Sequence, residues 1–172
     1  MIRAPRLREA LIGLAILGSV SSSGCVTPAS RAWDASLSPS MRKEVLQSLP
    51  EPARDSLLPL SEIFYGRITS RRFNSRATFE DPSVRELFPS LPAYSDYYAA
   101  LVDALDEAYI EYDRPTRVEL LAVEFDPKGL LWLTIRFTGR NDLPLRWWNA
   151  TLVRKDQWEW REDRWWVVPG KV

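Results

Sequence analysis

The chain contains no histidine and only one cysteine, Cys25, among its 172 residues. Without histidine there is no Ser-His-Asp or Cys-His catalytic arrangement and no imidazole acid–base chemistry, and the commonest metal ligand in proteins is missing. A single cysteine also has no partner for a disulfide within the chain. We therefore expect no metal, no cofactor and none of these catalytic arrangements.

The sequence also lacks an excess of charge of either sign, with 23 basic and 23 acidic side chains. When the first 25 residues are set aside, 20 basic and 22 acidic side chains are left, a net charge of about −2. Proteins that bind nucleic acid usually present a basic field. We therefore expect no nucleic-acid partner.

The apolar run from Ala10 to Val20 is too short for a comfortable membrane span, which needs roughly 20 residues. It follows a cationic segment with Arg3, Arg6 and Arg8, and it is followed by small residues. This order is typical of a secretory signal peptide.

The end of this segment resembles a bacterial lipoprotein signal, in which a small residue precedes the cysteine that becomes lipidated. Gly24 and Cys25 fit the pattern, and Ser22 stands where leucine is usual. The resemblance implies lipidation of Cys25 by several acyl chains, each methylene adding about 0.8 kcal/mol of membrane affinity. Because Val26 stands where an aspartate would resemble an inner-membrane retention signal, the implied location is the outer membrane, facing the periplasm. The alternative is an ordinary signal peptide beside an ordinary cysteine.

These features divide the chain into three parts. Residues 1–24 are the lipoprotein signal peptide, residues 25–37 are the lipidated cysteine with a flexible tether, and residues 38–172 are one domain. The tether is predicted because residues 26–36 contain proline, serine, alanine and threonine with little periodicity. The last part suits one domain with a single core.

The first part of the domain is predicted to be helical. Ser38-Pro39 has the residue types of a helix start, and a second helix is expected from Glu51-Pro52 to about Ile68. Pro59 is expected to kink or split that second helix. The most regular pattern begins at Ser95, where apolar residues recur at three- and four-residue steps as far as Tyr112.

Asp81 and Tyr98 are the only candidates for acid–base chemistry. A carboxylate in an apolar pocket can have its pKa raised, so Asp81 could act as a general base. Asp81-Pro82 is also an N-cap followed by proline at the first helical position, and we favour this interpretation. Tyr98 is interpreted as a packing residue in preference to a proton donor.

Arg67, Arg71, Arg72 and Arg76 form a basic group, either a solvated helix face or a contact for anionic lipid or an acidic partner. The acidic run from Asp96 to Glu111 is interpreted as a solvated face, because it lacks the glycine pattern of a calcium loop.

Four antiparallel strands are predicted between Arg117 and Pro169. The first, residues 118–125, ends at Asp126-Pro127-Lys128-Gly129, which has the preferences of a type I turn. The second, residues 131–138, alternates between an apolar face and a mixed one. A turn is predicted at residues 139–142, a long third strand at residues 143–160, a charged turn at Glu162-Asp163 and a last strand at residues 164–169.

This order of elements predicts an α+β fold. The segment from Phe73 to Pro82, the helix that follows and the closing Asp163-Arg164-Trp165-Trp166 hairpin resemble the nuclear-transport-factor-2-like superfamily. The resemblance implies a cone in which N-terminal helices pack in the concave face of a curved four-to-five-stranded antiparallel sheet. Some members of that superfamily are isomerases, dehydratases or epoxide hydrolases, and others bind only ligands or partners.

The tryptophans are the candidate contacts for a ligand or partner. Trp147 and Trp148 are adjacent in a predicted strand, so they are expected on opposite faces of the sheet, with Trp132 on the outer one. An aromatic outer face would mark a homodimer or an envelope protein partner. The alternatives are scattered surface tryptophans, cover by the segment around Trp33, and stacking on carbohydrate.

Together these observations predict an envelope lipoprotein whose domain binds a partner protein or small ligand without catalysis. The alternative is a small isomerase or hydratase that uses a carboxylate and a tyrosine inside the cone. A third interpretation is a structural module of a larger envelope assembly. An open pocket lined by an unpaired carboxylate would favour the enzyme, and a pocket filled by side chains such as Phe64, Phe79, Tyr98 and Phe137 would disfavour it.

Overall fold

A computed structural model describes residue 33 and residues 37–70, 80–126 and 130–170. In chain order the elements are α1 (Pro39–Gln47), α2 (Glu51–Ser70), α4 (Pro82–Arg85), α5 (Leu91–Glu107), the short 3-10 helix η1 (Glu111–Asp113), β1 (Arg117–Phe125), β2 (Leu130–Arg140), β3 (Asn149–Arg161) and β4 (Arg164–Val168). The described residues therefore form a mixed α+β structure with helices before strands, as predicted. They contain no helix long and apolar enough to cross a membrane.

The helices begin where proline and capping residues place them. Pro39 and Pro52 stand in the first turns of α1 and α2, and Asp81 and Ser90 cap α4 and α5 through their side chains. These positions suit proline because the first helical N–H groups have no partner within the helix. Helix α2 runs through Pro59 without a break, so the expected split there is wrong.

Helix α5 lies about four residues earlier than predicted. It starts at Leu91 because the Ser90 hydroxyl accepts a hydrogen bond from the Ala93 N–H at 3.2 Å. It ends at Glu107 because Tyr109 adopts a left-handed backbone, with φ of 57°. The Ile110 N–H then donates to the Leu105 carbonyl and the Tyr109 N–H to the Asp106 carbonyl, which is a Schellman motif.

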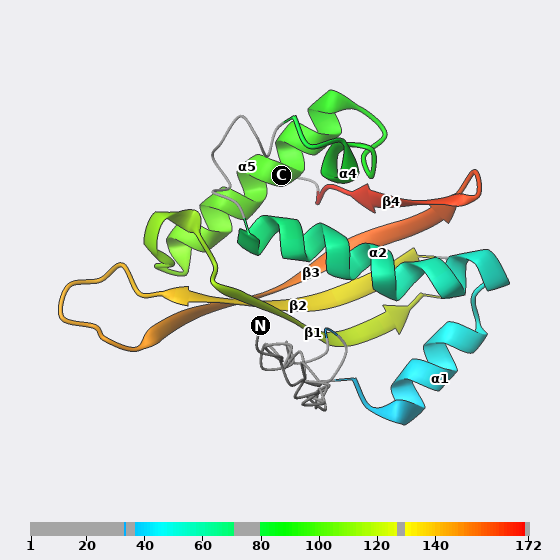
Figure 1. The fold of residues 1–172 in the computed structure, drawn as a ribbon, viewed down its shortest axis with the longest axis horizontal. Coiled ribbons are helices and arrows are strands. Elements are labelled where there is room, and N and C mark those ends of the chain that lie inside the picture. The colour runs from blue at the N-terminus through cyan, green and yellow to red at the C-terminus, as the bar shows by residue number, and fades with distance from the viewer. Residues whose placement is uncertain (1–32, 34–36, 71–79, 127–129, 171–172) are drawn as a thin grey trace, which may run out of the picture.

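The four strands form one open antiparallel sheet in the order β1-β2-β3-β4 (Figure 1), which confirms the predicted meander. The two-residue turn between β3 and β4 has φ of 55° at both Glu162 and Asp163, the geometry that suits the twist of a tight hairpin. The turn predicted after β1 includes residues 127–129, which lie outside the described residues.

The predicted turn at residues 139–142 is wrong, because β2 continues to Arg140. Gly139 allows a close approach: a Cβ atom built there would lie 2.5 Å from Ile110 Cγ2 and 3.3 Å from the Arg114 carbonyl oxygen. The chain instead turns between Asn141 and Trp148, and β3 begins at Asn149. Trp147 and Trp148 therefore lie in a loop and do not occupy opposite faces of the sheet.

The core lies between one face of the sheet and the helices. The alternating residues of β2 predicted to share an apolar face are all fully buried: Leu131, Leu133, Ile135 and Phe137. Phe64 and Tyr65 of α2 pack against Trp158 of β3, with ring centroids 5.6 Å and 6.3 Å from it. Trp33, upstream of α1, stacks on Tyr65 at 5.3 Å and donates to the Ser61 hydroxyl at 3.0 Å, so the folded part includes Trp33.

The outer face, the one opposite the helices, is more polar than predicted. Lys155 and Glu124 pair across it at 2.8 Å, and Glu119 contacts both Arg117 and Arg136. Trp132 is half-buried there. Trp166 lies on the same face, with the Arg164 and Arg161 guanidinium groups 3.8 Å and 5.2 Å from its ring. The continuous aromatic face expected from the sequence is therefore absent from the described strands.

At each edge of the sheet, a backbone N–H of the edge strand donates a hydrogen bond to a carbonyl group outside the sheet. At the β1 edge, the Leu120 N–H donates to the Trp33 carbonyl at 3.4 Å, and at the β4 edge the Val167 N–H donates to the Leu87 carbonyl at 2.8 Å. The Arg164 side chain adds a bond to the Glu86 carbonyl at 2.8 Å. Backbone outside the sheet therefore covers part of each edge.

Trp165→Ala is expected to lower the free energy of unfolding by about 3–5 kcal/mol, because the indole is buried and donates to the Ala53 carbonyl of α2 at 3.1 Å. Trp166→Ala is expected to cost less, since this indole, although only 8% exposed, lies outside the core cluster and packs against the Arg161 and Arg164 guanidinium groups, with its N–H donating to the Arg161 carbonyl at 3.3 Å. Urea unfolding of both variants measures the difference, and equal losses would contradict the assigned faces.

Candidate functional site

Asp81 is a helix cap, as the favoured interpretation predicted. Its Oδ1 accepts hydrogen bonds from the Ser83 N–H at 3.0 Å and from the Ser83 hydroxyl at 2.6 Å, and its Oδ2 lies 3.8 Å from Arg67 Nε. Tyr98 lies half-buried on α5, with its ring 6.2 Å from that of Tyr94. Burial, followed by the nearby Tyr94 and Asp113, raises the pKa of Tyr98 to about 12.

A different carboxylate occupies the core. Asp156 of β3 is 3% exposed, and its Oδ2 accepts hydrogen bonds from the hydroxyl groups of Tyr65 in α2 and Tyr97 in α5, each at 2.7 Å. Its Oδ1 accepts from Arg154 Nε at 2.6 Å. The Arg154 guanidinium lies 4.8 Å from the centre of the Tyr97 ring, and the Trp158 indole N–H donates to the Tyr65 hydroxyl at 3.3 Å. We call Asp156, Tyr65, Tyr97 and Arg154 the carboxylate cluster.

The electrostatics of this cluster keep both tyrosines protonated. Burial raises the pKa of Tyr65 and Tyr97 well above the usual value of 10.0, and the adjacent Asp156 raises the pKa of both further. The hydroxyl groups therefore stay as donors and Asp156 stays as their acceptor. Since Arg154 occupies the other oxygen, the carboxylate is fully engaged by side chains, and the cluster joins α2 and α5 to β3.

Sequence reasoning missed this cluster because it considered only Asp81 and Tyr98. A signal was present: Arg154 and Asp156 are in the same two-residue phase as Trp158 and Trp160, so a strand through these residues points all four to one face. On α5 the buried positions are Tyr94, Tyr97, Leu101 and Leu105. The predicted apolar stripe included Leu101 and Leu105 but took Tyr98 in place of Tyr97, the residue that contacts Asp156.

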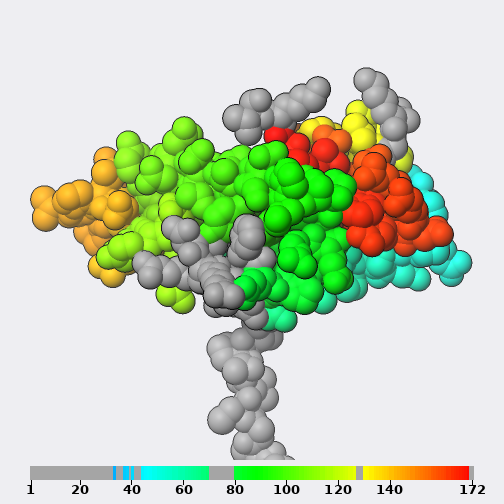
Figure 2. All heavy atoms as spheres, turned by 90° about the horizontal axis from the view of Figure 1, so that it is seen from above, coloured from blue at the N-terminus to red at the C-terminus, as the bar shows by residue number. Residues whose placement is uncertain are grey.

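The second candidate site lies where the loop between β2 and β3 leaves the body of the molecule. This loop protrudes at one end of the molecule in both views (Figures 1 and 2). Leu145 is 98% exposed, Trp147 91% and Trp148 50%. Tyr109 and Tyr112, in the segment after α5, are also exposed, at 51% and 70%. We call these five side chains the end surface.

Backbone and side-chain contacts fasten the two segments together. Ile110 and Asn141 form an isolated β-bridge, the Asp142 N–H donates to the Tyr109 carbonyl at 2.9 Å, and Arg140 pairs with Glu111 at 3.3 Å. The Asn141 side chain accepts from the Leu143 N–H at 2.9 Å, which fixes the start of the loop. The exposed side chains are therefore carried by a braced loop.

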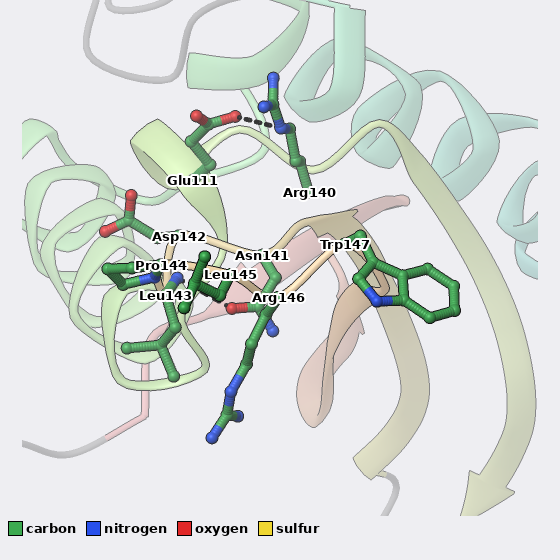
Figure 3. A pocket seen from close by; sticks show the side chains of 9 residues that line it. All are labelled: Glu111, Arg140, Asn141, Asp142, Leu143, Pro144, Leu145, Arg146 and Trp147. Carbon is green, nitrogen blue, oxygen red and sulfur yellow. Dashed lines mark hydrogen bonds and ion pairs between the residues drawn. The ribbon is translucent and has the colours of Figure 1, made fainter.

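A shallow pocket of 630 Å³ opens beside this loop. Figure 3 shows the Glu111–Arg140 pair on one side and the Trp147 indole projecting outward on the other. The surroundings are acidic: partial burial, followed by the charges of Asp106, Asp142 and Asp103, raises the pKa of Asp113. The remaining lining residues are Asn141, Asp142, Leu143, Pro144, Leu145 and Arg146.

Three of the five residues of the end surface have a strained backbone conformation. Tyr109, Tyr112 and Leu145 all have positive φ, of 57°, 57° and 64°. A left-handed conformation costs a residue other than glycine about 1–2 kcal/mol, and glycine would avoid the cost. These large side chains therefore stand in positions where folding alone favours glycine.

Of the remaining expected contacts, Trp148 lies 5.5 Å from the Arg146 guanidinium, while Trp132 lies on the outer face and not at the end surface. Cys25 lies outside the described residues, as do Phe79 and the basic residues 71, 72 and 76. Within the described ranges, no group of three or more His, Cys, Asp or Glu side chains is arranged to hold a metal ion.

Comparison of the chain with known protein families, with curated proteins and with solved structures finds no match. The two candidate sites are therefore supported by the positions and contacts of their own residues.

The free energy of unfolding is expected to fall as the pH rises above about 10, because the unfolded tyrosines then lose protons that the buried ones keep. Each such tyrosine contributes a slope of about 1.4 kcal/mol per pH unit between its unfolded and folded pKa. Tyr97→Phe should make the slope shallower by about that amount, as measured by urea unfolding at pH 10 to 11. The exposed Tyr112→Phe is the matched control, and an identical slope in both variants would contradict the assignment.

Proposed function

We propose that this chain is a lipid-anchored protein of the bacterial cell envelope whose domain binds a partner without catalysis. The anchor is assigned to Cys25, on the resemblance of residues 1–25 to a lipoprotein signal, and the location to the outer membrane facing the periplasm. The contacts of α2 and α5 with one face of the sheet support a cone-like arrangement of the nuclear-transport-factor-2-like kind.

The observation that carries the binding role is the end surface. Leu145 and Trp147 are almost fully exposed on a braced loop, and aromatic side chains are the residues that most often dominate binding energy at interfaces. The outer sheet face is the weaker candidate for a homodimer or a partner, because ion pairs such as Glu124–Lys155 cross it. We therefore place the partner at the end surface.

A small isomerase or hydratase is the second candidate. The carboxylate cluster provides the residue types that such an enzyme would use, an aspartate and two tyrosines in the interior. In the structure, however, Asp156 already accepts from Tyr65, Tyr97 and Arg154, so both of its oxygens are occupied. This arrangement suits a role in stability better than proton transfer to a substrate.

Cys25→Ala is expected to move the protein from the membrane fraction to the soluble periplasm, because the acyl chains supply the stable anchoring. Cell fractionation with detection of the protein checks this. A second variant, in which residues 1–25 are replaced by a signal peptide cleaved before Val26, excludes retention by an uncleaved signal. Ser23→Ala, which keeps the cysteine, is the control, and membrane association of both anchor variants would overturn the lipid anchor.

A photoreactive amino acid placed at position 147 is expected to form a discrete adduct in intact cells, because the end surface is occupied there. The same group at Thr151, which is exposed on the outer face, should give none. Electrophoresis and mass spectrometry of the purified protein measure both. No adduct at position 147, or equal adducts at the two positions, would overturn the end surface as the binding site.

A further inference from the structure

The number of residues between Cys25 and Trp33 limits how far the domain can lie from the proposed anchor. Trp33 is docked on α2 through Tyr65 and Ser61, and only eight residue steps separate it from Cys25. A fully extended chain spans at most about 3.5 Å per residue, so the lipidated cysteine would lie within about 28 Å of Trp33. On the proposed lipid anchor, the domain is therefore held at the bilayer surface.

The end surface lies within reach of the same bilayer. The Trp33 carbonyl contacts Leu120, which is opposite Ile135 in β2. From Ile135 to the end of β2 at Arg140 is five residues, about 17 Å at about 3.4 Å per residue. The protruding loop begins there, so one membrane plane can meet both Cys25 and the tip of the loop.

The composition and shape of the tip fit a lipid interface. Leu145 is apolar, and the indoles of Trp147 and Trp148 combine an apolar ring with an N–H donor, as in the aromatic side chains that settle at membrane–water boundaries. The tip is also a projection (Figure 2), which a deformable bilayer can accept without a matching groove. Arg146, beside Trp148, supplies a basic group at the level of the lipid headgroups.

We propose that the partner of the end surface is the bilayer that carries the anchor, and that Leu145, Trp147 and Trp148 insert into its interface. This inference rests on the proposed lipid anchor and names the occupant of the same binding site. Two contacts with one membrane, the acyl chains and the loop, fix the orientation of the domain, which a single flexible anchor does not. Because Asp142 and Glu111 balance the charges of Arg140 and Arg146 around the pocket, we expect the contact to depend on the apolar side chains and not on attraction to anionic lipid.

The test uses the full lipidated protein reconstituted into phosphatidylcholine vesicles that contain brominated phosphatidylcholine, which quenches nearby tryptophans. Because two of the eight tryptophans would lie in the interface, about a quarter of the emission should be lost. Replacing part of the lipid by phosphatidylglycerol should leave the quenching equal or smaller. The absence of quenching in the wild-type protein would overturn the proposal.

Leu145→Asp keeps all eight tryptophans and puts a charge on the tip, so it should abolish the quenching. Aspartate tolerates the left-handed conformation better than leucine, and position 145 is exposed, so the variant is expected to fold. Val153→Asp, at an exposed site on the outer face, is the matched control and should be quenched like the wild type. Quenching that persists in Leu145→Asp would overturn insertion of the tip.

Other outcomes separate this inference from the proposed function. Flotation with the vesicles reports the lipid anchor independently of quenching. A protein adduct in place of a lipid adduct at position 147 in cells would overturn the bilayer as partner while leaving the binding surface intact. A dimer in detergent that Leu145→Asp converts to a monomer, measured by sedimentation, would instead assign the surface to a second copy of the chain.

Discussion

The hydrogen bonds to the Asp156 carboxylate are the constraint on which the arrangement of helices and sheet depends. A buried charge without partners is strongly destabilising, so Tyr65, Tyr97 and Arg154 must all be in place when the core closes. Apolar contacts between α2, α5 and β3 would tolerate sliding, whereas hydrogen bonds at 2.7 Å do not. The cluster thus gives one register to a core that is otherwise built of aliphatic and aromatic side chains.

Contacts at the end of β2 keep the exposed side chains of the end surface in place. The end of β2 is held against the segment after α5 by the Ile110–Asn141 bridge and the close contact at Gly139. This bracing supports the positive φ angles of Tyr109, Tyr112 and Leu145, which would relax in a free loop. Strain and exposed apolar area are therefore concentrated at one end of the molecule.

Much of the fold could be predicted from local residue chemistry. Proline and capping residues located the starts of α1, α2 and α4, and the alternation of β2 gave its buried face, because both signals depend on neighbours in sequence. The loop before β3 could not be found in this way. Glycine is common in turns, but at position 139 the missing side chain lets Ile110, from a distant segment, approach the strand closely. The same limit applied to the candidate site, since the meeting of Tyr65, Tyr97 and Asp156 depends on packing between three elements.

The covered edges of the sheet have a consequence for assembly. Proteins with open outer strands can recruit an extended peptide or another subunit by strand addition, which uses free backbone donors along the edge. Here the Trp33 carbonyl takes a donor of β1 and the Leu87 carbonyl takes a donor of β4. Continuous β-augmentation from either side is therefore obstructed, and polymerisation of the chain into an extended ribbon would first require both flanking segments to detach.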